Sequence, residues 1–256
     1  MKNLIKIEFY KLLHGKSKYI LLISFSFMFL APIIILKFSN PLLTNKDFFS
    51  NLSLFYNISY NLLLPISVGI FTLSSICNEY KDKPIKTLLM SKYPRSLILI
   101  AKYITLFISC IIVYICTVAP YSLIAYFLSN KSPIYFNYKL ATVSQVIINL
   151  IEYNFMIIFY ISTIIAFCIM LGLIFKKQSI SVILYIITIT FISTLFNYLE
   201  NKGVLVRQYT FVALSNLDFL GIPGYTYLKL KSIIPAFSNV FLFLGISTIV
   251  FDKYEY

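Results

Sequence analysis

The sequence predicts an all-α protein that crosses a membrane six times, and three observations support that fold class. Hydrophobic residues make up 59% of the 256 residues, whereas a soluble domain is about 45–50% apolar. The apolar residues form long unbroken runs, and a helix needs about 20 such residues to cross a bilayer. Charged residues are only 12% of the chain and gather between the runs. A β-barrel would instead show short alternating segments.

Six apolar runs are the predicted spans. Two of them, 97–128 and 143–175, are longer than one crossing requires, so each is expected to continue into an interfacial or kinked segment. Pro120 within the third run is compatible with a membrane helix, because neighbouring groups satisfy the carbonyl that proline frees. An even number of spans puts both termini on the same side. The other four runs are 19–36, 52–76, 179–199 and 233–251.

The distribution of Lys and Arg predicts that both termini are cytoplasmic. With the N-terminus inside, fourteen of the 22 Lys and Arg residues lie on the inner side and eight on the outer side. Short cytoplasmic loops carry such an excess of positive charge. The net charge of +13 therefore reflects topology, since the Lys and Arg residues lie on no soluble segment large enough to form a groove for nucleic acid.

The chain is expected to form a single transmembrane domain, 1–256, with three segments outside the spans. Residues 1–18 are either an interfacial helix or a simple positive segment before the first span. Residues 77–96 form a cytoplasmic loop, and "FKKQS" at 175–179 has room only for a tight turn. Residues 200–232 form a long extracellular connection, apolar enough to lie in the interface or to dip back into the membrane.

The cytoplasmic loop concentrates charge in the stretch "CNEYKDKPIKTLLMSKYPRSL" at 77–97. Pro84 suits the first turn of a helix, and Pro94 disfavours helix in the residue before it. The residues between them predict a helix of about nine residues, about 13 Å long, with Leu88 and Leu89 on its apolar face. Such a short helix is marginal in water. It either rests on the membrane surface, as part of a solvated loop that enforces orientation, or docks in a groove of a partner protein.

This layout resembles the ABC-2 type membrane subunits of ATP-binding-cassette exporters. In that family the loop between the second and third spans carries an acidic residue, a Thr-Leu-Leu helix, a Pro-Arg pair and a lysine that enters the third span. The matching positions here are Glu79, Thr87-Leu88-Leu89, Pro94-Arg95 and Lys102. The resemblance covers essentially the whole chain. One departure is Lys86, where the family commonly has glycine, and this lysine-rich version is similar to permeases of bacitracin and lantibiotic self-protection exporters.

The resemblance implies a permease without catalytic activity of its own in the plasma membrane of a bacterium. It would dimerise with itself or a sibling permease and carry two cytoplasmic ATPase subunits, which would bind the ATP and Mg²⁺. The implied substrate is amphipathic or hydrophobic, and this branch suggests an antimicrobial peptide. Independently, none of the seven glycines begins the G-x-x-x-x-G-K-[ST] loop that cradles phosphates. The residues implied in ATPase coupling are Glu79, Thr87, Leu88, Leu89, Pro94 and Arg95.

Glu152 supports the main alternative, an ion-coupled secondary transporter. A carboxylate deep in a span is a functional hypothesis by default, but a span that starts near Asn154 leaves Glu152 at the outer interface. A third hypothesis is a non-transporting sensor or assembly protein that uses the same loop to bind a signalling partner. We expect no metal site, because the single histidine, His14, cannot form a histidine pair. The four cysteines are expected to serve as apolar packing.

Overall fold

The computed structural model describes residues 1–15, 17–39, 63–81, 93–128, 135–136, 139–140, 143–202 and 226–253. Within them the chain is helical apart from a small antiparallel hairpin in which β1 (Tyr135–Phe136) pairs with β2 (Lys139–Leu140). The helices are α1 (Lys2–His14), α2 (Ser17–Ser39), α4 (Leu64–Lys81), α6 (Arg95–Leu128), α7 (Val143–Phe175), α8 (Gln178–Asn201) and α9 (Thr226–Asp252).

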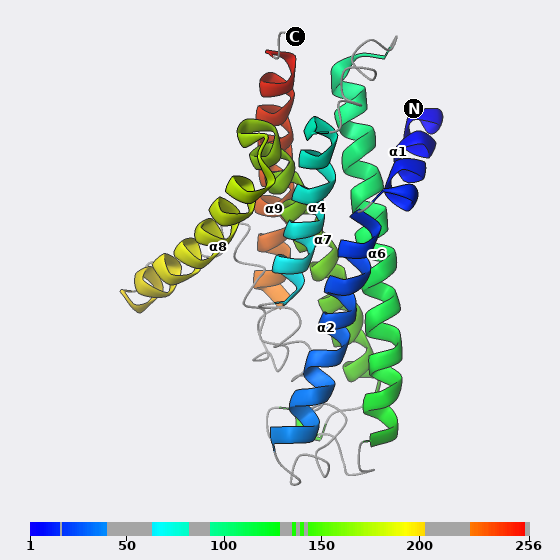
Figure 1. The fold of residues 1–256 in the computed structure, drawn as a ribbon. Helices are drawn as coiled ribbons and strands as arrows, with labels where there is room; N and C mark the ends of the chain where they lie inside the picture. The colour runs from blue at the N-terminus through cyan, green and yellow to red at the C-terminus, as the bar shows by residue number, and fades with distance from the viewer. Residues whose placement is uncertain are drawn as a thin grey trace.

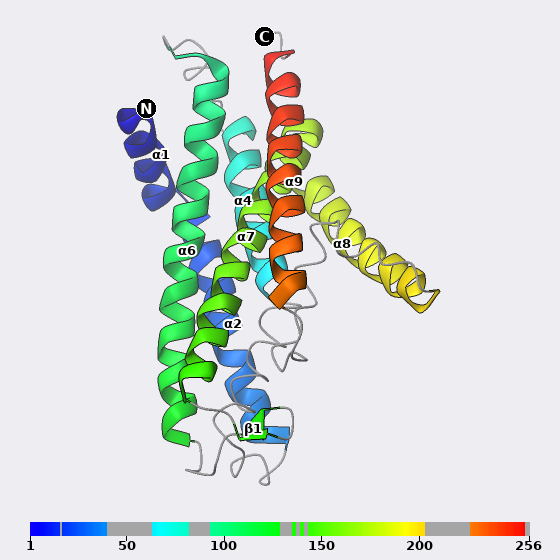
Figure 2. The same cartoon turned by 180° about the vertical axis from the view of Figure 1, so that it is seen from behind.

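The long helices form a bundle in which successive helices run in alternating directions (Figures 1 and 2). The N-terminal helix α1, the last turn of α4, the first turn of α6 and the C-terminal turn of α9 all lie at one end, which we call the charged end. The hairpin and the start of α7 lie at the other end. Both termini are therefore at the same end of the bundle, as an even number of crossings requires. α8 leaves the bundle and points away from it in both views.

α7 is the central helix of the bundle. In the most apolar 18-residue window of Asn154–Phe175, 78% of the residues are buried, compared with 44% in the corresponding window of Arg95–Leu123 on α6 and 17% in that of Ile234–Asp252 on α9. The hydroxyl of Tyr114 on α6 donates to Oδ1 of Asn154 on α7 at 2.7 Å. α7 is thus surrounded by other helices, while α9 lies at the periphery with an exposed apolar face.

Two glycines allow α4 to approach its neighbours closely. A Cβ at Gly69 would collide with the ring of Tyr185 on α8, whose hydroxyl donates to the Pro65 carbonyl at 2.6 Å. A Cβ at Gly172 of α7 would lie 3.0 Å from Cγ2 of Ile76 on α4. Small residues at such contacts let membrane helices approach one another closely, here with a side chain of the neighbouring helix filling the space above each glycine. Gly69 and Gly172 therefore set the separation of α4 from α8 and α7.

The tight turn that the sequence predicts between the fourth and fifth spans is present. α7 ends at Phe175 and α8 begins at Gln178, so only Lys176 and Lys177 connect them. Lys176 adopts the left-handed conformation with φ of 55°, and its N–H donates to the carbonyl of Gly172 at 3.1 Å. A non-glycine residue is strained in the left-handed region. Lys176 adopts this conformation because only two residues are available to reverse the direction of the chain.

Several helices differ in length from the apolar runs. α7 spans residues 143–175 as predicted, and α6 continues through Pro120 as one helix. α4 runs five residues beyond the run that ends at 76, and α9 begins seven residues before 233. The predicted cytoplasmic loop of 77–96 thus starts inside α4, and the predicted connection of 200–232 overlaps both α8 and α9.

Three stretches of the described residues are long and apolar enough to cross a membrane: Arg95–Leu123, Asn154–Phe175 and Ile234–Asp252. α2 and α8 add the shorter apolar stretches Ser17–Ala31 and Gln178–Phe191. α4 is less apolar over its length, because its last turns hold Asn78, Glu79 and Lys81. The multi-pass helical architecture is confirmed, and the count of six spans stays a prediction.

Among the described residues, the cysteines form no disulfide, and neither they nor the histidine belong to a metal-ligand cluster. Cys77, Cys110 and Cys168 are buried, Cys116 is exposed, and all four are free thiols. The exposed His14 ring stacks on Tyr10 of the same helix, with ring centroids 4.0 Å apart. No group of three or more His, Cys, Asp or Glu residues among the described positions is arranged to hold a metal ion.

Candidate coupling site

The charged end brings together the elements on both sides of the segment predicted to contact a partner. Residues 82–92 connect α4 to α6 and lie outside the described residues, so the predicted site residues Thr87, Leu88 and Leu89 do too. The described part resumes at Tyr93. Glu79 lies in the last turn of α4, and Pro94 and Arg95 begin α6.

A glycine turn positions α1 at this end. α1 stops at Gly15, whose N–H donates to the carbonyl of Lys11 at 2.8 Å. A Cβ on residue 15 would lie only 2.8 Å from that carbonyl oxygen, so the turn favours glycine. The turn directs one face of α1 inward, where Leu4 and Glu8 are 2% and 3% exposed. α1 thus places a carboxylate inside the protein.

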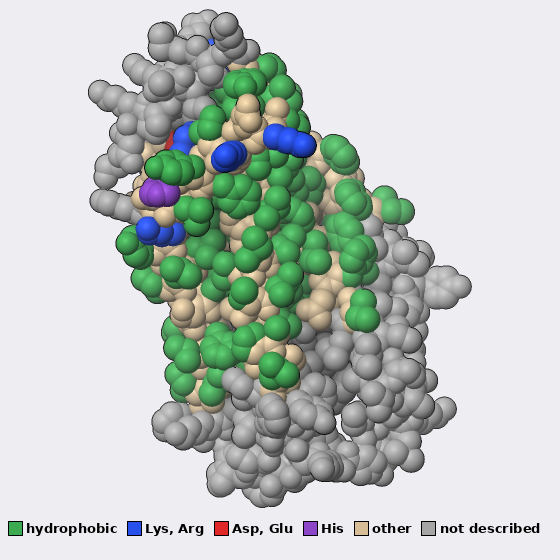
Figure 3. Space-filling model, turned by 90° about the vertical axis from the view of Figure 1, so that its right-hand side faces the viewer, with side chains coloured by type: hydrophobic (Ala, Val, Ile, Leu, Met, Phe, Trp, Pro, Cys, Tyr) green, Lys and Arg blue, Asp and Glu red, His purple; other side chains and the backbone are tan. Residues whose placement is uncertain are grey.

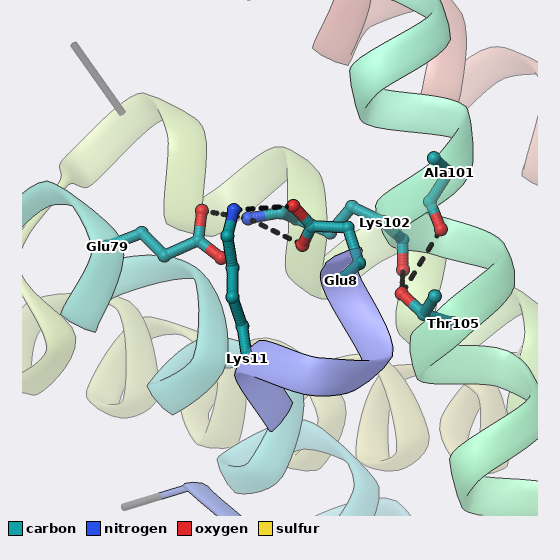
Figure 4. A network of polar contacts seen from close by, with 6 residues as sticks. All are labelled: Glu8, Lys11, Glu79, Ala101, Lys102 and Thr105. Atoms are coloured by element: carbon teal, nitrogen blue, oxygen red, sulfur yellow. Dashed lines mark hydrogen bonds and ion pairs between the residues drawn. The ribbon is translucent and has the colours of Figure 1, made fainter. Parts of the chain in front are cut away.

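Lys102 of α6 joins this carboxylate to a second one. Its ammonium nitrogen contacts Oε2 of Glu79 on α4 and lies 3.7 Å from Oε2 of Glu8 on α1. Lys11 of α1 donates to the other oxygen of Glu8, Oε1, at 2.8 Å. Figure 4 shows Lys102 reaching between the two carboxylates from the opposite side to Glu79. We call Glu8, Lys11, Glu79 and Lys102 the charge network.

Burial makes the network energetically consequential. The side chains of Glu8, Lys102 and Glu79 are 5%, 12% and 13% exposed, whereas that of Lys11 is 30% exposed. Two carboxylates and two ammonium groups balance one another. Removing one partner from a buried set leaves an uncompensated charge, which costs about 3–5 kcal/mol. The network therefore ties α1, α4 and α6 together as long as all of its buried members remain in contact.

The turn of α6 that carries Lys102 has an additional constraint. The Thr105 hydroxyl lies 3.1 Å from the carbonyl of Ala101 and 2.8 Å from that of Lys102, and it donates to them (Figure 4). Such back-bonding occupies a hydroxyl that would otherwise be buried without a partner. Thr105 is fully buried, so it satisfies its own polar group beside the network.

Arg95 contacts the last helix of the chain. Its guanidinium nitrogen Nη1 donates to the carbonyl of Asp252 at 2.9 Å and to that of Phe251 at 3.3 Å. The carbonyls at the end of a helix lack intrahelical partners, and a cation there is favourable. The Pro94 carbonyl accepts from the N–H groups of Leu97 and Ile98 at 3.0 and 3.3 Å, which starts α6. Arg95 thus links the beginning of α6 to the end of α9.

The structure places the predicted site residues unequally. Glu79, Pro94 and Arg95 lie at the charged end, and Glu79 belongs to the charge network. Glu152 is within α7, and its side chain lies outside what the structure describes. Sequence reasoning missed Glu8 and Lys11 as site residues. One signal was present, because Glu8 is the only acidic residue among the first 46.

Lys102 appeared in the sequence only as a lysine at the start of a span. Its contacts show that it bridges two helices, which no local pattern indicates. Residues this far apart in the chain become neighbours only because α1 packs on α6 and the fold brings Glu79 of α4 to Lys102.

The comparisons with known proteins identify a family. The sequence model described as "ABC-2 family transporter protein" matches residues 4–197, which run from α1 nearly to the end of α8. No match was found among curated protein sequences. The matched region contains Glu8, Glu79, Arg95 and Lys102. Because the match covers most of the chain, this protein belongs to the ABC-2 family of transporter proteins, as a multi-pass membrane permease.

Proposed function

We propose that the chain is the permease subunit of an ATP-binding-cassette exporter whose two ATPase subunits bind at the charged end. The observation that carries the proposal is Lys102, held between Glu8 of α1 and Glu79 of α4. Family membership implies ABC ATPase partners. Those partners supply ATP and Mg²⁺, and the permease converts their movement into a change of its helices.

The geometry supports a direct route for this movement. Glu79 lies three residues before the segment 82–92, and Arg95 lies three residues after it. A partner that moves this segment displaces the last turn of α4 and the first turn of α6 together. The charge network then carries the displacement to α1, because Lys102 contacts both carboxylates. Packed rigid helices transmit such shifts as hinge or shear motions.

The distribution of charge supports a cytoplasmic location for the charged end. Figure 3 shows Lys, Arg and His side chains gathered toward that end of one face, with hydrophobic side chains covering the face below them. The turn between α7 and α8, which consists of the exposed Lys176 and Lys177, lies at the same end as the C-terminus (Figure 1). Lysines cluster on the cytoplasmic side of membrane proteins. Both termini are then cytoplasmic.

The substrate and the dimer follow from the resemblance to exporters of the self-protection type. We propose an amphipathic or hydrophobic substrate, an antimicrobial peptide being the first to test, moved outward across a bacterial plasma membrane. The permease pairs with a second copy or with a sibling permease.

Co-purification tests the ATPase partnership. The permease is expressed with its genomic neighbours and isolated in detergent, and ATP hydrolysis in the sample is measured. Replacing residues 84–93 by a Gly/Ser linker, or Leu88 and Leu89 by aspartate, should remove the ATPase, because the apolar face can no longer fill a groove.

The matched control replaces the same two leucines by methionine, which keeps their volume and apolar character and should retain the ATPase. An ATPase that stays bound to the aspartate variant would show that 84–93 is not the docking element. A permease that retains no ATPase in any form would contradict the exporter function.

A further inference from the structure

Arg95 occupies a position that its own helix disfavours. It is the first residue of α6, and the N-terminus of a helix carries partial positive charge that repels a cation. The same side chain reaches the C-terminal carbonyls of α9, where the partial charge is negative. The contact with α9 therefore compensates the unfavourable position in α6. A residue that breaks a local rule and binds the end of a distant helix indicates a tertiary role.

α9 needs such a tie because packing attaches it mainly to one helix. Along its length it packs on α7, where Phe237 meets Phe159 and Phe243 meets Phe167, both with ring centroids 5.1 Å apart. Its outer side chains, such as Phe241 and Ile249, are exposed. The hydroxyls of Ser247 and Thr248 bond back to carbonyls of α9 itself. The guanidinium of Arg95 thus adds a polar attachment from α9 to the first turn of α6.

The position of Arg95 also connects this attachment to the charge network. Lys102 follows Arg95 by seven residues, which is about two helical turns and returns to the same side of α6. One basic residue holds α9 and the other holds α1 and α4. α6 is therefore the helix that the other three share at the charged end.

We propose that Arg95 is a clamp that makes the C-terminal end of α9 move with the first turn of α6. The clamp gives Arg95 a function inside the chain, as a positioning residue, distinct from a contact with a partner. α9 then follows when the segment before α6 is displaced, although it packs chiefly on α7. The transport part of this inference rests on the proposed function, whereas the clamp itself is a property of the permease alone.

The first measurement uses the permease without any partner. Cysteines replace the exposed Tyr93 and Lys253, and Cys116→Ser removes the exposed native thiol, leaving the buried Cys77, Cys110 and Cys168. Spin labels on the two new cysteines report the separation of the α6 and α9 ends in lipid nanodiscs. We expect one narrow distance population, and loss of that population to a broad one with Arg95→Gln.

Two further variants distinguish a clamp from a general effect of charge. Arg95→Lys keeps the charge but lacks the planar guanidinium whose Nη1 reaches both carbonyls, so it should give an intermediate width. Lys177→Gln removes one positive charge from an exposed site at the same end and should leave the population narrow. An unchanged distribution in Arg95→Gln, or equal broadening in Lys177→Gln, would overturn the clamp.

The second measurement repeats the labelling in the complex with its ATPase, with and without a non-hydrolysable ATP analogue. The separation should stay the same in the wild type, because the two ends move together. In Arg95→Gln the analogue should separate them. A wild-type separation that changes on nucleotide binding would overturn the coupled movement. A complex that does not assemble would contradict the proposed function alone, because the first measurement decides the clamp without a partner.

Discussion

The interior around α7 and the charged end are held together by different forces. In the interior, α4 packs on α8 and α7 at Gly69 and Gly172, where a single added methyl group would collide with Tyr185 or crowd Ile76. At the charged end, α1, α4 and α6 meet through buried carboxylates and ammonium groups. The first region depends on close van der Waals contact, which acts only over a short range. The second depends on ion pairs, in which a charged group can change its partner.

This difference assigns the two regions different mechanical roles. A close-packed contact between helices has one favourable arrangement, and its stabilising energy falls steeply when one helix shifts against the other. An ion network with two carboxylates on one ammonium can lengthen one contact while it keeps the other. Under the proposed function, the interior would therefore be the rigid body that is moved, and the charged end the joint where movement enters.

Lys102→Met should produce the largest loss of stability. The methionine leaves the buried carboxylates of Glu8 and Glu79 without their shared cation, which costs about 3–5 kcal/mol. Thermal unfolding of the Cys116→Ser background is followed with a thiol-reactive fluorophore, which gains signal as the buried Cys77, Cys110 and Cys168 become accessible.

The control for this variant removes the charges together. Glu8→Gln and Glu79→Gln in the Lys102→Met background eliminate the two carboxylates that Lys102 neutralises, so much of the lost stability should return. A Lys102→Met protein that unfolds at the wild-type temperature would show that the network is not a structural tie and would weaken the contrast between the two regions.

Gly69→Ala should have the next largest effect and tests the other region. The new methyl group meets the Tyr185 ring, and overpacking of this kind costs about 1–3 kcal/mol. Gly245→Ala is the matched control, because a Cβ there has no atom within 4 Å and alanine favours the helix. The same unfolding assay should show a loss for residue 69 and none for residue 245. Equal behaviour of the two variants would contradict the close approach of α4 and α8.

The apolar runs predicted the helices well where charge or a turn ends the helix. The run of 143–175 coincides with α7 at both ends. Its C-terminal end is well defined because Lys176 and Lys177 follow it directly. The prediction was less accurate for α4 and α9, which extend through "NEYK" and "TYLKLKS". Glu, Lys and Leu favour helix whether or not they are apolar, so a helix continues past the end of a hydrophobic run.

The candidate site was less predictable from sequence because it depends on contacts between distant helices. Glu79, Arg95 and Lys102 were singled out through a resemblance, but the contacts that they make were not. Glu8 lies 71 residues before Glu79 and 94 before Lys102, and the pattern of α1 does not show which face is buried. Arg95 was expected to serve a partner protein, and the structure shows it bound to the end of α9.

Lys11→Gln should have the smallest effect and sharpens the comparison within the network. Lys11 and Lys102 both contact Glu8, but the Lys11 side chain is 30% exposed and that of Lys102 is 12% exposed. An ion pair three residues apart on a partly exposed helix contributes about 0–1 kcal/mol, and Lys102 still neutralises Glu8 after the substitution. The unfolding temperature should fall slightly at low salt, and the difference from wild type should shrink at high salt, because salt screens exposed charges. A loss as large as that of Lys102→Met would mean that Glu8 relies on its own helix for its counter-ion, and the link from α1 to α6 would then carry little of the network's stability.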